Sequence, residues 1–163
     1  VIYPLIAGTQ WQVIALTCDN KGIPKYVQTR LNIAVELVER AKEHGITPER
    51  IHLDPLVIAL STDNFSLLNF LETMKRIKEV YPTLKITSGL SNISFGMPLR
   101  KVVNQCFLTI AAFEGMDSAI MDPCNRDMIA ALLATEALRG QDRNCRNFAN
   151  AYRKGRIGAK KEE

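Results

Sequence analysis

The sequence predicts a parallel α/β fold, on two observations. Short continuous apolar runs, typical of strands that are buried on both faces, alternate with longer stretches whose apolar residues recur at helical spacing. Each run and the stretch after it span similar lengths, so the chain consists of repeated strand–helix units. Strands that alternate with helices in this way pair in parallel, because each helix returns the chain to the same end of the sheet.

Four strand–helix units are expected along the chain. The predicted strands are the apolar runs 13–18, 50–54, 84–88 and 118–121. The predicted helices occupy about 25–44, 63–81, 98–110, 126–139 and 142–153, the last one closing the ordered part of the chain. Glycine and proline mark several helix ends: Gly45 is a C-cap, Pro82 follows a helix and Pro98 opens one.

Each predicted strand is followed by an acid or an amide. These residues are Asp19, Asp54, Asn92 and Asp122, at intervals close to the length of one strand–helix unit. Ligands of parallel α/β folds bind at the carboxyl ends of the strands, so the four side chains form a candidate polar site. Asp and Asn also form turns and cap helices, and for Asp19 and Asp122 that role stays equally open. A binding role is favoured for Asp54 and Asn92, because more loop follows them.

Four units can form an open doubly wound sheet or one half of an eight-unit barrel. A complete barrel takes about 250 residues, more than the 163 residues of this chain. The chain also opens inside an apolar stretch, without an initiator Met, which suggests that it is a fragment. The periodicity alone does not distinguish the two folds.

Composition excludes several classes of protein. With 47% apolar residues and a net charge of +4, the chain is neither disordered nor collagen-like. No apolar run reaches the roughly 18 to 20 residues that cross a bilayer, and no signal peptide is evident, so a cytoplasmic protein is expected. Basic residues gather near the C-terminus without aromatic residues between them. We therefore expect a disordered tail at 156–163 and no nucleic-acid partner.

Cysteines and histidines show no pattern of a metal site. The four cysteines are Cys18, Cys106, Cys124 and Cys145. They form no Cys-x-x-Cys pair and have no histidine at ligand spacing, so we expect reduced, buried thiols and no metal ligand. His44 lies at a predicted helix end and His52 within a strand, and neither is assigned to the site. A Gly-x-Ser-x-Gly turn, a P-loop and a Gly-x-Gly-x-x-Gly loop are missing as well.

Four segments resemble one family of enzymes. They are 16–24, 52–56, 88–96, which contains Gly-Leu-Ser-Asn, and 117–123. In order and spacing they are similar to the pterin-binding methyltransferases that transfer a methyl group from methyltetrahydrofolate to a corrinoid protein. The nearest types are the methyltetrahydrofolate:corrinoid/iron–sulfur protein methyltransferases and the pterin domain of cobalamin-dependent methionine synthase. The resemblance implies a (β/α)8 TIM barrel, of which residues 1–155 form the C-terminal part with the last four βα units.

The resemblance also implies the chemistry of the site. Asp54 matches the acid that binds the pterin ring, and a carboxylate suits this role because it can accept both the ring N–H and the 2-amino group. Asn92 matches the amide that hydrogen-bonds N5, where an interaction that strengthens as charge develops speeds the transfer. Gly89 and Ser91 shape the same loop and contact the substrate. The family's site also uses an Asp and an Asn from earlier strands, which have no match in this sequence.

The resemblance assigns the reaction to a corrinoid, so no nucleophile from this chain is required. Methyltetrahydrofolate is the expected methyl donor, or tetrahydrofolate the acceptor in reverse. The chain lacks an Asp-x-His-x-x-Gly corrinoid motif, so a partner protein is expected to carry the corrinoid and to dock over the barrel mouth. The resemblance further implies a homodimer with a role in one-carbon metabolism.

Three alternatives stay open. Dihydropteroate synthase shares the pterin-binding barrel, but its last strand carries an Arg-x-His segment, and residues 118–123 hold no basic residue. A pterin-binding or partner-docking module without turnover is the second alternative. A flavodoxin-like domain with a free-standing sheet is the third, and it would make the candidate site a coincidence.

Overall fold

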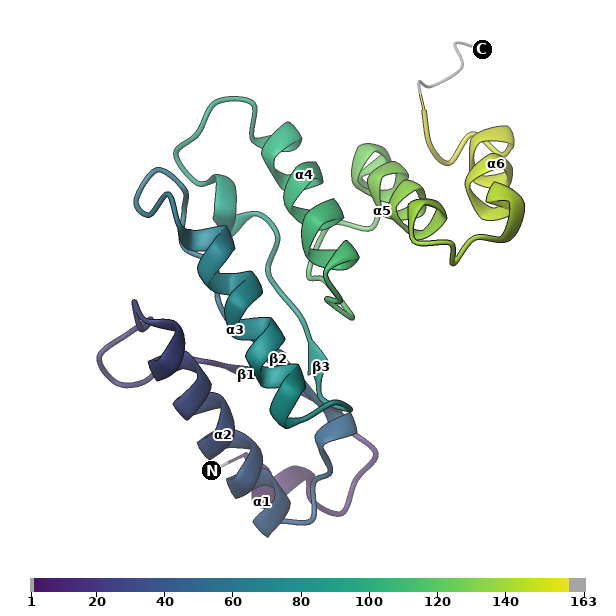
Figure 1. Ribbon diagram of the computed structural model, residues 1–163. Coiled ribbons are helices and arrows are strands. Elements are labelled where there is room, and N and C mark those ends of the chain that lie inside the picture. Colours follow the sequence, from purple (N-terminus) through teal and green to yellow (C-terminus); the bar gives the residue numbers. More distant parts are fainter. Residues whose placement is uncertain (1, 159–163) are drawn as a thin grey trace.

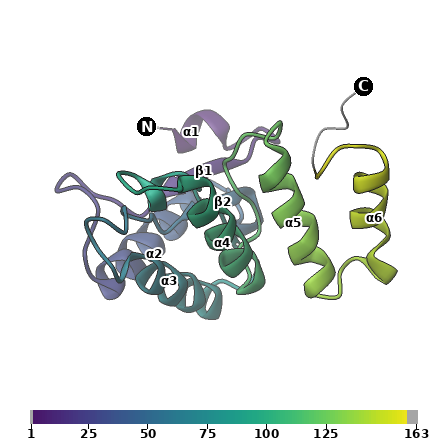
Figure 2. The same cartoon turned by 90° about the horizontal axis from the view of Figure 1, so that it is seen from above.

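The computed structural model describes residues 2–158, and its centre is a three-stranded parallel sheet. Strands β1 (Val13–Leu16), β2 (Ile51–Asp54) and β3 (Lys85–Ile86) lie side by side in the order β1-β2-β3 (Figure 1). Helices α2 (Val27–Glu43) and α3 (Ser66–Val80) connect them, and Figure 2 shows both helices on the same side of the strands. The predicted parallel α/β class is therefore confirmed.

Short and C-terminal elements complete the described chain. They are α1 (Tyr3–Ile6), α4 (Arg100–Phe113), α5 (Arg126–Leu138), α6 (Arg146–Arg153) and the 3-10 turns η1 (Pro48–Arg50), η2 (Asn92–Ser94) and η3 (Arg143–Cys145). Each predicted helix is formed, but four of the five, α2, α3, α4 and α6, begin later than predicted. Helix α4 starts after Pro98 because Leu99 has a left-handed φ of 50°, and α6 starts late because Asn144 and Cys145 are also left-handed.

The fourth predicted strand, 118–121, forms only one bridge, in which Ile120 pairs in parallel with Gly89. The N–H groups of Asp117 and Ser118 both donate to the last carbonyl of β3, at 2.9 and 3.1 Å. In a regular strand successive N–H groups point to opposite sides, so this double contact interrupts the ladder. The described residues therefore form neither a fourth strand nor a closed barrel.

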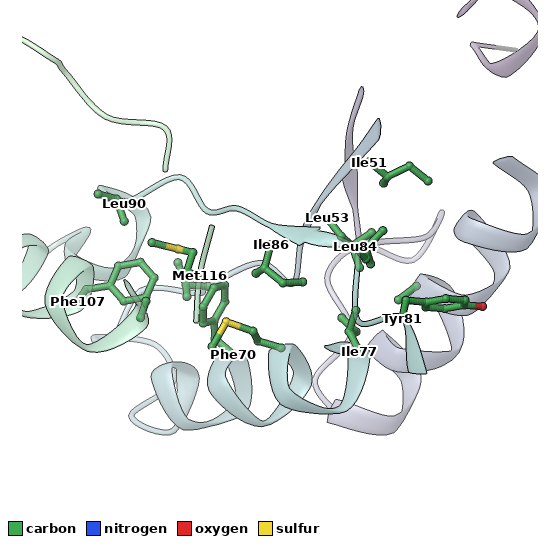
Figure 3. Close-up of a cluster of buried hydrophobic side chains, with 14 of the residues drawn as sticks. Ile51, Leu53, Phe70, Ile77, Tyr81, Leu84, Ile86, Leu90, Phe107 and Met116 are labelled. Atoms are coloured by element: carbon green, nitrogen blue, oxygen red, sulfur yellow. The ribbon is translucent and has the colours of Figure 1, made fainter. Parts of the chain in front are cut away.

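The hydrophobic core lies between the sheet and helices α2, α3 and α4. Figure 3 shows its side chains, among them Leu53 and Ile86 from the strands and Phe70 and Phe107 from α3 and α4. The Phe70 and Phe107 rings meet edge to face with their centres 5.5 Å apart. This packing fixes the two helices against each other, and with them the loops that lead from the strands into the helices.

The opposite face of the sheet is largely open. The register places Ile14 beside His52 and Leu16 beside Asp54, and these residues alternate with those that face the core. Ile14, Leu16 and Ile120 are 50%, 45% and 54% exposed. Figure 2 shows the short α1 on this side of the strands, in contrast to the three helices on the other.

All four cysteines are exposed free thiols, so the prediction that they are buried is wrong. They lie after β1, on α4, in the loop before α5 and in η3, as Cys18, Cys106, Cys124 and Cys145. A thiol is a small apolar group, so its exposure costs little. Burial of a cysteine therefore depends on where the fold places its position, which the sequence analysis did not resolve.

The C-terminal segment of the described chain packs beside α5 and α6. Ile157 is 3% exposed, and the Arg126 guanidinium donates hydrogen bonds to the carbonyl groups of Gly155 and Gly158. Residues 156–158 belong to the predicted tail, whose remaining residues, 159–163, lie outside the described part of the chain. No helix between residues 2 and 158 is long and apolar enough to cross a membrane.

Candidate functional site

Asp54 is the last residue of β2, and its side chain links two loops. It is 4% exposed. One carboxyl oxygen, Oδ1, accepts a hydrogen bond from the Leu56 N–H at 2.8 Å, and Oδ2 accepts a longer one from the Gly89 N–H at 3.4 Å. The carboxyl group therefore connects the loop that follows β2 with the loop that follows β3.

Burial raises the pKa of Asp54 above its ordinary value, because the charged form loses its water. Four groups offset part of this effect: the N–H groups of Leu56 and Gly89, the positive charge of Arg30 and the Ser88 hydroxyl. That hydroxyl is fully buried and has no hydrogen-bond partner of good geometry among residues 2–158. An ionised carboxylate has about four lone-pair positions, so two remain for a ligand.

The turn after Asp54 is strained. Leu56 has a φ of +64°, in the left-handed region that a leucine rarely occupies. Such a conformation costs about 1–3 kcal/mol and persists only where neighbouring contacts hold it. Here the buried Arg30 side chain donates from Nη1 to the Pro55 and Leu56 carbonyls, at 3.2 and 2.8 Å. The structure thus supports the strained turn from the adjacent helix.

The loop after β3 brings Asn92 close to Gly89. A Cβ atom added to Gly89 would lie 3.4 Å from Asn92 Nδ2, so the amide group rests against the glycine backbone. Because the Gly89 N–H in turn donates to Asp54, the three predicted site residues form one continuous group. Asn92 opens η2 and is exposed, which leaves its amide available to a ligand.

Ser91 lies beside this group, and its carbonyl oxygen is held by Arg100. The Arg100 Nη2 donates to the Ser91 carbonyl at 2.9 Å, and its Nε donates to the Ser94 hydroxyl at 3.1 Å. The guanidinium also lies 5.9 Å from the centre of the Phe95 ring. Arg100, the first residue of α4, therefore braces the loop that carries Ser91 and Asn92.

Asp19 and Asp122 each form a local turn. Asp19 Oδ1 accepts from the Lys21 N–H at 2.7 Å, and Asp122 Oδ1 accepts from the Cys124 N–H at 2.8 Å. Among the described residues, neither side chain forms a hydrogen bond with Asp54 or Asn92. Both are exposed, and their geometry matches the turn-forming role that was left open for them.

His52 lies on the open face of the sheet, two residues before Asp54. Its Nδ1 is 2.7 Å from the Ser118 hydroxyl and its Nε2 is 2.7 Å from Gln12 Oε1. A carbonyl oxygen only accepts, so Nε2 carries the proton and the Ser118 hydroxyl donates to Nδ1. Both ring nitrogens are thus engaged within the protein, and burial lowers the pKa of His52.

Two arginines beside the candidate site, Arg30 and Arg100, were not predicted from the sequence. Arg30 belongs to the buried stripe of α2, whose other members follow at helical spacing: Ala34, Val38 and Ala41. That spacing was a signal, because an arginine on an apolar stripe must find partners inside the protein. For Arg100 the sequence offers no comparable signal. No group of three or more His, Cys, Asp or Glu side chains in residues 2–158 is placed to hold a metal ion.

Comparison with known proteins identifies the family. The family model described as "Pterin binding enzyme" matches residues 2–122, which include β1, β2, β3 and the loops that carry Asp54 and Asn92. The chain belongs to the pterin binding enzymes. The predicted recognition of a pterin-binding family is therefore confirmed.

Three relatives with known names are similar to this chain. The chain is 53% identical over 160 residues to the methylcorrinoid:tetrahydrofolate methyltransferase of Eubacterium limosum. The matched region covers 97% of this chain and 59% of that protein. The chain is 34% identical over 124 residues to the methionine synthase of Mycobacterium tuberculosis (strain ATCC 25618 / H37Rv), and 33% to that of Mycobacterium leprae (strain TN). Each of these two matches covers 72% of this chain and 10% of the synthase.

Proposed function

We propose that this protein transfers the N5-methyl group of methyltetrahydrofolate to the Co(I) corrinoid of a partner protein, or catalyses the reverse reaction. The observation that carries the proposal is the buried Asp54 carboxyl at the end of β2, with Gly89 and Asn92 beside it. The Eubacterium limosum relative, whose name specifies methylcorrinoid and tetrahydrofolate, supports the same assignment over 97% of this chain.

Asp54 is proposed to orient the pterin. Its two unused lone-pair positions match the two donors on one edge of the ring, the ring N–H and the 2-amino group. Hydrogen bonds that a buried carboxylate accepts are stronger than those in water, because the local dielectric is low. The pterin edge therefore replaces the water that Asp54 lost on folding, and the ring is held in one orientation.

Asn92 is proposed to act on N5. When the methyl group leaves, the bond between N5 and the methyl carbon breaks, its electron pair stays on N5, and N5 takes up a proton. The Asn92 amide can donate to the N5 lone pair or accept from the protonated nitrogen, so its contact strengthens as the bond breaks. The methyl carbon bonds to the cobalt of the corrinoid, which is a substrate carried by the partner.

Exposed apolar side chains around the loops suit a protein partner. Tyr26, Phe95 and Leu99 are 71%, 68% and 79% exposed, and they lie in the loops that lead from β1 and β3 into the next helices. Exposed aromatic and other large apolar side chains on loops are typical contacts of a docking surface. We assign them to contact with the corrinoid protein, because a methyl transfer requires that the cobalt reach the pterin.

The chain is proposed to form the last four βα units of a TIM barrel, with residues 1–155 as the C-terminal part of the pterin-binding domain. In such a barrel the open sheet face, with Ile14, Leu16 and Ile120, would become the packed interior.

We further propose that the protein is a cytoplasmic homodimer. Analytical ultracentrifugation of the full-length protein tests whether it is a dimer.

The reaction is tested by following the absorbance of Co(I) corrinoid on the partner protein after methyltetrahydrofolate is added to the full-length protein. We expect Asn92→Ala to slow methyl transfer by about 100-fold or more while weakening tetrahydrofolate binding by less than about fivefold. Asn64→Ala, an exposed loop amide outside the site, is the matched control.

Equal losses of rate and affinity in Asn92→Ala would contradict the role of Asn92. Binding of tetrahydrofolate without any methyl transfer would contradict the proposed reaction and favour a pterin-binding module.

A further inference from the structure

Arg30 joins the loops that follow β1 and β2. It lies in the first turn of α2, and its side chain is 0% exposed. Its Nε donates to the Pro24 carbonyl at 2.8 Å, and its Nη1 donates to the carbonyls of Pro55 and Leu56 at 3.2 and 2.8 Å. A single guanidinium therefore satisfies three backbone carbonyls from two loops.

The two carbonyls after β2 depend on these hydrogen bonds. Pro55 and Leu56 are buried, and a buried carbonyl without a donor is strongly destabilising. The same turn presents the Leu56 N–H to Asp54 Oδ1 at 2.8 Å and holds Leu56 at a φ of +64°. If Arg30 lost its contacts, the turn could relax toward an ordinary conformation, and the Asp54 carboxyl would lose the donor that fixes its orientation.

The charge of Arg30 is not neutralised by a direct ion pair. Among the described residues its guanidinium has no carboxylate within 4.0 Å, and its Nη2 has no hydrogen-bond partner. Its positive charge therefore acts across the protein interior on two acids, Asp63 before α3 and Asp54. Burial lowers the pKa of Arg30, but a guanidinium keeps its charge in proteins.

Among residues 2–158, the other groups that act on the Asp54 carboxyl are uncharged. Leu56 and Gly89 offer backbone N–H groups, and Ser88, beyond β3, offers a hydroxyl. From the β1 side, the Thr17 N–H donates to the Asp54 backbone carbonyl at 3.1 Å. Arg30 is the charged group that stabilises the ionised carboxylate.

We propose that Arg30 is a positioning residue of the proposed pterin site: by holding three carbonyls of two loops it fixes the turn after β2, and with it the orientation of the Asp54 carboxyl toward the ligand. The role assigned to the ligand rests on the proposed function. The coupling between Arg30 and Asp54 does not, so it can be tested without any ligand.

The test is a titration of the Asp54 carboxyl carbon by NMR in the full-length protein labelled with ¹³C at aspartate, with Asp54→Asn identifying the signal. We expect Arg30→Met to raise the pH midpoint by about 1 unit or more, because the nearby positive charge is removed. Arg50→Met is the matched control: Arg50 also donates to backbone carbonyls, those of Ile6, Ala7 and Trp11, but at the other end of β2. Equal midpoints in the two variants would overturn the inference.

Arg30→Lys serves if Arg30→Met does not fold. A lysine keeps the charge but cannot hold three carbonyls in the geometry of a guanidinium. We expect amide hydrogen exchange at Leu56 to become about tenfold faster in Arg30→Lys and to stay unchanged in Arg50→Lys. Unchanged exchange at Leu56 in Arg30→Lys would overturn the proposed positioning role.

Tetrahydrofolate binding separates this inference from the proposed function. Affinity for tetrahydrofolate should fall once the pH is low enough to protonate Asp54. In Arg30→Met we expect this loss to occur at a higher pH, raised by as much as the Asp54 midpoint. If the wild-type protein binds no tetrahydrofolate, the proposed function fails, while the NMR midpoints and the exchange rates still decide the role of Arg30. If Arg30→Met shifts the titration midpoint of Asp54 but not the pH dependence of tetrahydrofolate affinity, the part of the inference that concerns the ligand is wrong.

Discussion

The Asp54 carboxyl is buried, so the binding role proposed for it comes at the expense of stability. The sheet places it at the end of β2 with 4% of its surface exposed, and burial disfavours its charge. Hydrogen bonds from Leu56 and Gly89 and the charge of Arg30 compensate only in part, so its pKa stays raised. A ligand that brings two N–H donors would complete the compensation.

The raised pKa of Asp54 predicts a specific pH dependence of stability. Between the ordinary value of 3.8 and the raised native value, the folded protein binds more protons at Asp54 than the unfolded chain does. The free energy of unfolding of wild type, relative to Asp54→Asn, should therefore fall as the pH rises through this window. Urea unfolding of the two full-length proteins at a series of pH values measures this difference.

Asp142→Asn is the control of opposite sign. The N–H groups of Asn147 and Phe148 donate to the Asp142 carboxylate at 2.9 and 3.0 Å and lower its pKa. Its contribution to stability should therefore be lost as the pH falls through the lowered value. A wild-type stability that rises with pH relative to Asp54→Asn would contradict the burial account of Asp54.

At the scale of elements, the sequence predicted the helices better than the strands. The spacing of apolar residues in the sequence indicates which side of a helix is buried. Each predicted helix is therefore found in the structure. The first and last residues of a strand depend instead on its hydrogen bonds to the neighbouring strand. Of the predicted strand 84–88, only Lys85 and Ile86 form a strand, β3, and of the predicted strand 118–121, only Ile120 forms a bridge. The reason is that the hydrogen-bond ladder between these two segments is irregular.

The candidate site was predictable where a strand carries it. Asp54 and Asn92 follow from the rule that ligands bind at the carboxyl ends of parallel strands, and Gly89, which the family resemblance indicated, links them. The same rule also selected Asp19 and Asp122, which form local turns instead. The roles of Asp54, Gly89 and Asn92 toward a pterin remain a prediction.

Arg30 could have been found from its place on the buried stripe of α2. Arg100 could not, because it holds the backbone carbonyl of Ser91, a contact that a sequence pattern does not reveal.

The contact between α3 and α4 is predicted to stabilise the loops of the site. Phe107 is 2% exposed and meets Phe70, whereas Phe113, on the same helix, is 58% exposed. We expect Phe107→Ala to lower the free energy of unfolding by about 3–5 kcal/mol. Phe113→Ala should change it by less than about 1 kcal/mol. Urea unfolding of the full-length variants measures both, and similar losses in the two would contradict the packing described here.

At the scale of the whole molecule, the two faces of the sheet differ in kind. One face is covered by α2, α3 and α4 and holds the core (Figures 1 and 2). On the other face, Ile14, Leu16 and Ile120 are exposed. The chain spans 59% of the length of the Eubacterium limosum relative. An open apolar face beside the candidate site is consistent with the proposed barrel, in which further strands would cover it.

The most direct test of the pterin site is calorimetric titration of the full-length protein with tetrahydrofolate, comparing wild type, Asp54→Asn and Asp19→Asn. An amide cannot accept both donors of the pterin edge, so Asp54→Asn should weaken binding by about 100-fold, which corresponds to the loss of about one charge-assisted hydrogen bond. Asp19 is exposed and closes its own turn, so Asp19→Asn should leave the affinity within about threefold of wild type. Wild-type affinity in Asp54→Asn would contradict the central claim that this carboxylate binds the pterin.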